Sequence, residues 1–249
     1  MSPGRPAGPL ARWYDANGRH ALAWRNTRDR WAIYVSEVML QQTQVSRIAV
    51  AWPTFLRAFP TPKAMAARPV GDVVRTWDRL GYPRRARWLW ESARAIAADG
   101  WPEDLATLPG IGPYTAAAVA SLVDDADVVA LDVNIRRIAE RVEGRPLSNA
   151  AAETTVRRLG RGLAPRDRLL ALMDLGALVC TARAPECGAC PLRRKCASRG
   201  VRDGERRSRQ APFAGSFRQR RGQVMAALRV APTPVDTLDA DALQSLVAD

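Results

Sequence analysis

The sequence has little of what a secreted or membrane protein requires. Its first residues, MSPGRPAGPLARWYDANG, contain no apolar core of the kind that a secretory signal peptide carries. No apolar run approaches the length that crosses a bilayer. Only four cysteines occur in 249 residues, and disulfides persist mainly in oxidising compartments. We therefore expect an intracellular, cytoplasmic protein with no membrane segment and no disulfide framework.

Acidic residues are also few relative to basic ones. The chain has 25 acidic against 38 basic residues, a formal net charge of +13 and a pI near 10.9. Such an excess attracts a polyanion, most simply nucleic acid, and predicts association with the nucleoid. The alternative explanation is a set of arginine-rich solvated faces with no partner.

Alternating strand patterns do not rise above a helical background. Between Trp31 and Trp52 the apolar residues recur at helical spacing, and similar patterns continue to the cysteine-containing stretch. After it, residues 199–218 are basic, polar and broken by Gly and Pro, which indicates a linker. We expect an all-α fold, and a short helical segment over 219–249 that ends as an incomplete module.

All four cysteines lie in one stretch, Cys180-x6-Cys187-x2-Cys190-x5-Cys196. Zinc held by four thiolates usually takes two C-x-x-C pairs, and this stretch has one. Four bunched thiolates are also the ligand set of an iron–sulfur cube. The single C-x-x-C pair favours the cluster, and the spacing alone leaves zinc an equal alternative.

A second motif, LPGIGPYTAAAVASL, runs from Leu108 to Leu122. A helix ends, Gly110 and Gly112 form a G-x-G turn, and a helix of small residues begins near Tyr114. This is the pattern of a helix-hairpin-helix element, whose backbone N–H groups hold a phosphate oxygen at a helix N-terminus. Such contacts position DNA without identifying bases. The alternative is an ordinary glycine connection between helices.

Five motifs in order resemble the helix-hairpin-helix DNA glycosylases, most of all the adenine DNA glycosylase branch, which removes adenine mispaired with oxidised guanine. They are SEVMLQQTQV, LGYPRRAR, LPGIGPYTA, LDVNIRR and the cysteine stretch. The resemblance covers roughly residues 20–198. It implies a two-lobed fold, with a six-helix barrel over 25–126 and a second lobe formed by 1–24 and 127–198. It also implies that a [4Fe-4S] cluster is bound by Cys180, Cys187, Cys190 and Cys196.

Cleaving an N-glycosidic bond needs an acid for the leaving base and a negative charge for the oxocarbenium-like sugar. By resemblance Glu37 is the acid, and its apolar helix should raise its pKa. By resemblance Asp132 faces the sugar, and its place before a helix favours the ionised form. Taken alone, Glu37 fits a solvated helix face and Asp132 an ordinary cap. Their joint occurrence inside matching motifs favours the catalytic roles.

Lysine is nearly absent, and this bears on the reaction. Bifunctional relatives form a Schiff base through a lysine just after the hairpin, where this chain has Tyr114. Lys63 and Lys195 are its only lysines, and neither is suitably placed. The resemblance therefore implies a monofunctional, water-using glycosylase, with Tyr114 lining the site and Asn134 supporting the aspartate. We expect a monomer acting on double-stranded DNA.

The resemblance also implies DNA contacts. Gln42 and Tyr82 match residues that wedge into the base stack opposite the extruded base. Candidate phosphate contacts are the basic string Arg84, Arg85 and Arg87 and the basic residues 193–195. The other predicted DNA-contacting residues are Trp24, Arg25, Gln41, Thr43 and the hairpin glycines Gly110 and Gly112.

Some positions depart from the family pattern. Leu170 stands where many members have Glu or Gln near the adenine, and Pro83 and Val133 replace a common tyrosine and glycine. Some fifty residues follow the cysteines, too few for the usual domain that recognises oxidised guanine. Two alternatives therefore stay open: a mismatch glycosylase removing thymine or uracil opposite guanine, and a noncatalytic DNA-binding relative. Retention of both carboxylates argues against the second.

Overall fold

The computed structural model describes residues 8–202, 204–205 and 212–248, and over these residues the chain is all-α, with no strand. This confirms the predicted fold class. Five short 3-10 helices connect the longer elements: η1 (Ala23–Arg25), η2 (Asp78–Leu80), η3 (Leu105–Thr107), η4 (Arg193–Lys195) and η5 (Val235–Thr237). The α-helices are α1 (Pro9–Asn17), α2 (Arg30–Leu40), α3 (Val45–Ala58), α4 (Pro62–Ala66), α5 (Val70–Trp77), α6 (Arg84–Asp99), α7 (Pro113–Asp124), α8 (Val133–Glu143), α9 (Asn149–Leu159), α10 (Pro165–Leu178), α11 (Phe217–Val230) and α12 (Ala240–Ala248).

The helix starts follow from local sequence. The side chain of Asp29 caps α2, and that of Asp132 caps α8, because a short polar side chain satisfies free N–H groups of the first turn. Pro113 and Pro165 occupy the first positions of α7 and α10, where a missing N–H has no cost.

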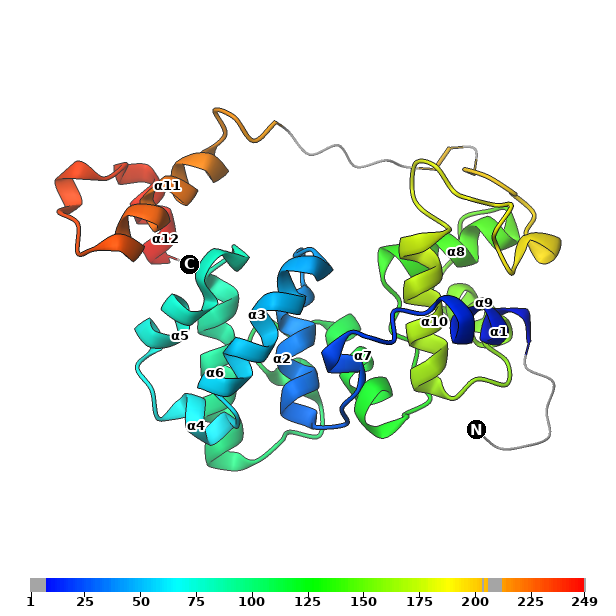
Figure 1. Ribbon diagram of the computed structural model, residues 1–249, viewed down its shortest axis with the longest axis horizontal. Helices are drawn as coiled ribbons and strands as arrows, with labels where there is room; N and C mark the ends of the chain where they lie inside the picture. Colours follow the sequence, from blue (N-terminus) through cyan, green and yellow to red (C-terminus); the bar gives the residue numbers. More distant parts are fainter. Residues whose placement is uncertain (1–7, 203, 206–211, 249) are drawn as a thin grey trace.

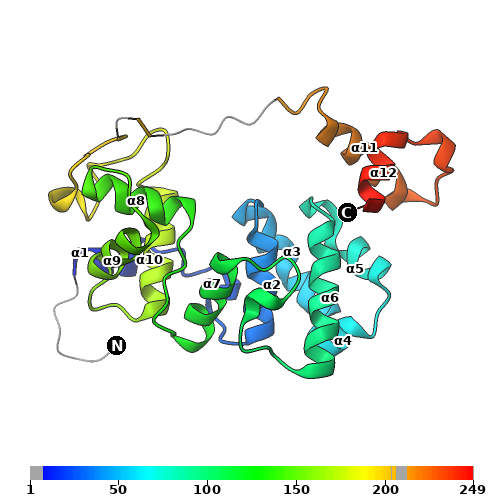
Figure 2. The same cartoon turned by 180° about the vertical axis from the view of Figure 1, so that it is seen from behind.

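One group of helices surrounds α2. Every residue of α2 from Trp31 to Met39 is buried, because α3, α6 and α7 all pack against it. Figures 1 and 2 show α2 to α6 together on one side of the molecule. The stretch from α2 to α7 contains six α-helices, the number expected for the barrel. The lobe boundaries remain a prediction.

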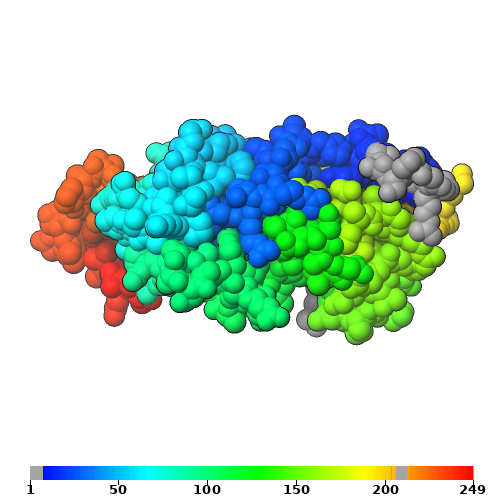
Figure 3. All heavy atoms as spheres, turned by 90° about the horizontal axis from the view of Figure 1, so that it is seen from below, coloured from blue at the N-terminus to red at the C-terminus, as the bar shows by residue number. Residues whose placement is uncertain are grey.

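A second group contains α1, α8, α9 and α10. Helix α10 is central to it, since it packs on α1 and α8 and also contacts α7 of the first group. In Figure 3 the N-terminal residues, in dark blue, lie across both groups on one face. The chain thus passes through the second group before it enters the first.

The C-terminal helices α11 and α12 pack against each other. They lie beside the first group, next to α5 (Figure 1), where the Arg229 guanidinium bonds the backbone carbonyl of Asp78. Helix α11 begins inside the predicted linker, because Ser216 caps it. Positions 203 and 206–211 of that linker lie outside the described residues. No helix in the described part of the chain is long and apolar enough to cross a membrane.

Candidate active site

A cavity of about 510 Å³ opens between η1, α2, α7, α8 and α10. It brings together residues predicted from separate motifs. Its lining includes polar side chains and the apolar Leu40, Leu170 and Met173. The predicted residues that line it are Trp24, Arg25, Glu37, Gln41, Gln42, Thr43, Tyr114, Asp132 and Asn134.

Glu37 reaches this cavity from the buried helix α2 and is 4% exposed. Burial raises its pKa to about 7, because the ionised carboxylate loses hydration. The Arg25 charge acts in the opposite direction, and the Asp132 charge adds to the rise. Near neutral pH this carboxyl group can therefore both hold and give up a proton.

Asp132 occupies a very different environment at the start of α8. Its Oδ1 accepts hydrogen bonds from the backbone N–H groups of Asn134 (2.9 Å) and Ile135 (2.7 Å). Its Oδ2 accepts one from Asn134 Nδ2 at 2.8 Å. Donors at a helix N-terminus favour a negative charge. Two carboxyl groups with opposed environments thus face one cavity.

Tyr114 and α10 complete the wall. The Tyr114 hydroxyl lies 3.9 Å from Met173 Sδ. Burial, with the negative charges of Glu37 and Asp132, raises the pKa of Tyr114, so the phenol stays neutral. Leu170 is 5% exposed and also lines the cavity. Leu170 and Met173 therefore offer apolar contact to a flat ring in the cavity more than they offer hydrogen bonds.

A buried ion pair between Arg25 and Asp174 was not predicted. Asp174 on α10 is fully buried and accepts hydrogen bonds from both terminal nitrogens of Arg25, at 2.6 and 2.8 Å. Arg19 adds a backbone bond of 2.8 Å and a side-chain bond of 2.6 Å. Burial acts to raise the pKa of Asp174, but the hydrogen bonds from Arg25 and Arg19 outweigh it and hold the pKa low. An acidic residue within the apolar run RLLALMDLGALV was the available signal.

The two predicted wedge residues differ in their relation to the cavity. Gln42 is among its lining residues, and Tyr82 is not among them and is 48% exposed. The neighbouring Gln41 donates to the Gly110 carbonyl and to Thr115 Oγ1, both at 3.3 Å. The end of α2 is therefore tied to the hairpin turn.

One predicted phosphate contact is wrong in its geometry. Arg85 is 4% exposed, and its guanidinium donates inward to backbone carbonyls such as those of Val38 and Met39. A group so enclosed cannot reach a phosphate. Arg87, by contrast, has a side chain 52% exposed and pairs with Glu91.

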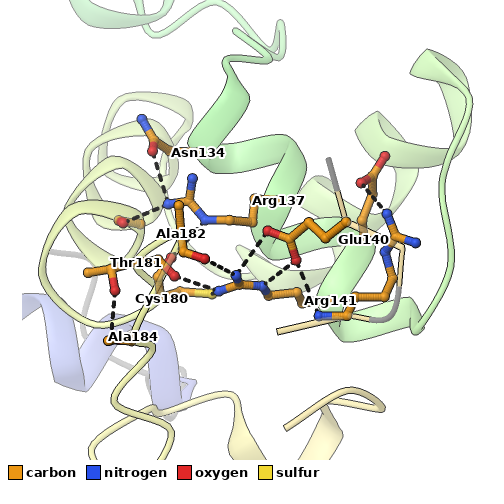
Figure 4. Close-up of polar contacts among 11 residues, drawn as sticks. Asn134, Arg137, Glu140, Arg141, Cys180, Thr181, Ala182 and Ala184 are labelled. Atoms are coloured by element: carbon orange, nitrogen blue, oxygen red, sulfur yellow. Dashed lines mark hydrogen bonds and ion pairs between the residues drawn. The ribbon is translucent and has the colours of Figure 1, made fainter. Parts of the chain in front are cut away.

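The four cysteines surround a second, small cavity of about 20 Å³. None of the four forms a disulfide, and Arg141 lies beside them, only 2% exposed. Its guanidinium donates to Cys180 Sγ (3.5 Å) and to the carbonyls of Thr181 (2.7 Å) and Ala182 (3.0 Å), as Figure 4 shows. Glu205 accepts two further bonds from it, each 2.9 Å.

The donor set of the cysteine cavity is compatible with two kinds of metal centre. Four thiolates can bind zinc or an iron–sulfur cluster. The cationic Arg141 lies beside Cys180, where it offsets the negative charge of thiolate ligands.

Arg137 joins this cavity to the first one. Its guanidinium donates to the carbonyl of Cys180 and to Asn134 Oδ1, both at 2.9 Å (Figure 4). Asn134 in turn donates to Asp132. The start of the cysteine loop and the candidate carboxylate therefore share one hydrogen-bond chain.

Comparison with known proteins identifies the fold. The family described as HhH-GPD superfamily base excision DNA repair protein matches residues 35–162. The chain is 43% identical over 246 residues to the adenine DNA glycosylase of Mycolicibacterium smegmatis, covering 93% of this chain and 83% of that protein. It is 35% identical over 215 residues to the human adenine DNA glycosylase, covering 77% of this chain and 39% of that one.

Solved structures agree with this assignment. A thermostable thymine-DNA glycosylase superposes with a TM-score of 0.69 at 26% identity, over 77% of this chain and 93% of the other. Endonuclease III in a non-covalent DNA complex superposes with a TM-score of 0.63 at 19% identity, over 76% of this chain and 91% of that one. The second likeness concerns the fold alone.

Proposed function

Because the chain belongs to the HhH-GPD superfamily of base-excision DNA repair proteins, we propose that it is a monofunctional adenine DNA glycosylase acting on adenine opposite 8-oxoguanine or guanine. The observation that carries the proposal is the pairing of Glu37 with Asp132 across one cavity. One carboxyl group is desolvated, and the other is held by helix N–H groups. Such opposed environments are what an acid and a charge stabiliser need.

The reaction divides between these two residues. Glu37 donates its proton to a ring nitrogen of the extruded adenine, and the electrons of the C1′–N bond leave with the base. Asp132, 2.7–2.9 Å from three N–H donors, keeps a fixed negative charge beside the cationic sugar. Water then adds at C1′, and its proton passes to the Glu37 carboxylate. Tyr114, in the position after the hairpin, supplies no amine for a Schiff base.

Duplex engagement would use the exposed elements around the cavity. Gln42 and Tyr82 enter the base stack, where an amide and an aromatic ring replace the contacts of the extruded adenine. The hairpin glycines Gly110 and Gly112 allow close approach of a phosphate. A monomer suffices, since all these groups belong to one chain. A place of action at the nucleoid follows from the substrate.

Cys180, Cys187, Cys190 and Cys196 would bind a [4Fe-4S] cluster. When bound, the cluster supplies four iron–thiolate links that make the loop rigid, and base hydrolysis needs no redox step. Arg141 then stabilises the thiolate of Cys180 and orders the carbonyls beside it. The loop presents Arg193, Arg194 and Lys195 to a phosphate backbone.

A second candidate is removal of thymine or uracil opposite guanine. The apolar wall of Leu170 and Met173 favours it, since that wall lacks a hydrogen-bonding side chain that selects adenine. The likeness to the thymine-DNA glycosylase at 26% identity points the same way. The relatives named as adenine DNA glycosylases favour the first candidate.

Single-turnover base release tests the proposal. The duplexes carry A opposite 8-oxoguanine, A opposite G, T opposite G, and U opposite G, and Glu37→Gln is the control. We expect preferential release of adenine, with loss of release but retained binding in the variant. Release of thymine or uracil alone would support the second candidate. Tight binding without any release would make the chain a noncatalytic relative.

A further inference from the structure

Two non-glycine residues at the DNA-facing rim have left-handed backbones. Gln42, just after α2, has φ 55°, and Tyr82, just after η2, has φ 49°. Such conformations are unfavourable for residues other than glycine and persist only where the surrounding structure holds them. These are the two residues proposed to enter the base stack. Something must therefore hold both loops in place.

Arg85 on α6 contacts both loops with one guanidinium. Its Nη1 donates to the carbonyls of Val38 and Met39, each at 3.0 Å, and to that of Gln41. Its Nη2 donates to Leu80 O (3.3 Å) and Gly81 O (3.1 Å). The first set precedes Gln42, and the second precedes Tyr82.

Further contacts of Arg85 strengthen this link. Nη2 also donates to Thr43 Oγ1 at 2.9 Å, and Thr43 Oγ1 in turn lies 3.3 Å from Leu80 O. The guanidinium carbon lies 5.4 Å from the Tyr82 ring centroid and 5.1 Å from that of Trp77. Thus the same cation bonds the backbone on both sides of the rim and lies against the wedge ring itself.

We propose that Arg85 is a positioning residue that locks the Gln42 and Tyr82 loops into one unit, so that both side chains enter the duplex together. This rests on the proposed function, because it assumes that these side chains replace an extruded base. Arg85 contacts no phosphate; it acts through Gln42 and Tyr82.

The residue type follows from this geometry. A planar guanidinium presents five N–H donors in a fixed fork, whereas a lysine ammonium has three donors at one point. Val38 and Met39 belong to the last turn of α2, where carbonyls lack helical partners and a cation is favourable. Burial lowers the pKa of Arg85 to about 10, so it stays charged at neutral pH. The same anchor holds the helix that carries Glu37.

A phosphate contact and a positioning role make opposite predictions for Arg85→Lys. Lysine binds phosphate well as a point charge, so a phosphate contact would survive this change. A lysine ammonium cannot reach all six acceptors, which lie at the end of α2 and in the two loops, so the positioning role would be lost. Arg94→Gln is the matched control, because Arg94 is an exposed arginine of the same helix.

The test measures single-turnover release of adenine at saturating DNA, and base extrusion by 2-aminopurine fluorescence in a Glu37→Gln background. We expect Arg85→Lys to lower the rate and the extrusion signal at least tenfold, with an unchanged salt dependence of DNA binding. Arg94→Gln should leave the rate and the extrusion signal unchanged. Circular dichroism and melting temperature verify folding. An unchanged rate and extrusion signal in Arg85→Lys would overturn the proposal.

A double-mutant cycle isolates the mechanism. If Arg85 acts through the two wedge residues, they are already lost in the Gln42→Ala/Tyr82→Ala double variant. Adding Arg85→Lys to that variant should then lower the single-turnover rate by less than a further twofold. If the rate losses of Arg85→Lys and of the double variant multiply, the link is refuted even though Arg85→Lys alone is slow.

If Arg85→Lys does not fold, Thr43→Val removes one acceptor of Nη2. This variant should also lower the extrusion signal, and an unchanged signal would refute the link. Wild-type protein that neither releases nor extrudes a base would refute the proposed function itself.

Discussion

Glu37 is the residue on which the proposed chemistry most depends, and its pKa makes a direct prediction. With a pKa of about 7, the acid form is present below this pH and disappears above it. The single-turnover rate should therefore fall about tenfold per pH unit above pH 7. Glu37→Gln should lower the rate about 10²–10⁴-fold and abolish this limb. A pH-independent rate between pH 6 and 9 would contradict the assignment of the acid.

The same carboxyl group predicts how stability depends on pH. Its folded-state pKa lies above the usual 4.5, so its contribution to stability is complete below pH 4.5 and is lost as the pH rises through about 7. At pH 8, Glu37→Gln should raise the free energy of unfolding, on the order of 3 kcal/mol. Urea unfolding of both proteins at pH 4.5 and pH 8 measures this. An equal difference at both pH values would contradict it.

Asp174 should affect the rate through Arg25. In Asp174→Asn, Arg25 keeps its charge but loses its carboxylate partner, so its field at Glu37 increases and lowers the pKa of that group. The falling limb of the pH–rate profile should move to lower pH, and stability should fall by about 3–5 kcal/mol. Asp124→Asn, which changes an exposed pair with Arg30, is the control. If stability falls but the falling limb of the pH–rate profile stays at the same pH, Asp174 affects only stability.

Individual residues were predictable from the sequence when they lie inside a motif, and were not predictable when their role depends on burial against distant parts of the chain. Glu37 and Asp132 lie inside motifs, and the structure brings both to one cavity. Asp174 meets Arg25 across 149 positions, and no local pattern encodes such a pair. In the string RRAR, nothing distinguishes the inward guanidinium of Arg85 from its exposed neighbours. Helix packing alone decides which one is enclosed.

Among the elements, the hairpin turn offers a matched pair of glycines. Gly110 has φ 73°, and a Cβ there would lie 2.3 Å from the Trp88 ring, whereas a Cβ on Gly112 meets nothing within 4 Å. Gly110→Ala should therefore destabilise the fold by at least 1–2 kcal/mol and weaken DNA binding. Gly112→Ala should fold normally. Thermal melting and DNA titration of both variants check this, and equal melting temperatures would contradict it.

Element boundaries were predictable where caps lie in the sequence. Asp132 was expected before a helix, and it caps α8 with two backbone bonds. The linker prediction to residue 218 was too long, because Ser216 accepts from the Gln219 N–H and begins α11 earlier. A basic, proline-containing stretch looks like linker until a cap within it is recognised. The contact of α11 with η2 through Arg229 and Asp78 had no sequence signal, since it joins positions 151 apart.

For the whole molecule, the charge of +13 predicts steep salt dependence of DNA binding. The two helix groups carry different parts of the proposed DNA-binding surface. The first carries the proposed wedge residues Gln42 and Tyr82, which are uncharged, and the second carries the cysteine loop with the basic Arg193, Arg194 and Lys195. A rigid loop is needed to keep the latter at a fixed distance from the cavity. The [4Fe-4S] cluster would supply that rigidity.

Cys187→Ser tests this division of roles. Losing one of four thiolates should remove the visible absorbance of the purified protein, lower its melting temperature and weaken DNA binding, with a shallower salt dependence. The rate at saturating DNA should fall less than the affinity, because Glu37 and Asp132 belong to α2 and the start of α8, outside the loop. Arg193→Gln is the control: it should reduce the salt slope by about 0.9 and leave absorbance and melting unchanged. If Cys187→Ser binds DNA with wild-type affinity and salt slope, the loop contributes no phosphate contact, and the basic charge that binds DNA must lie with the helices around the cavity.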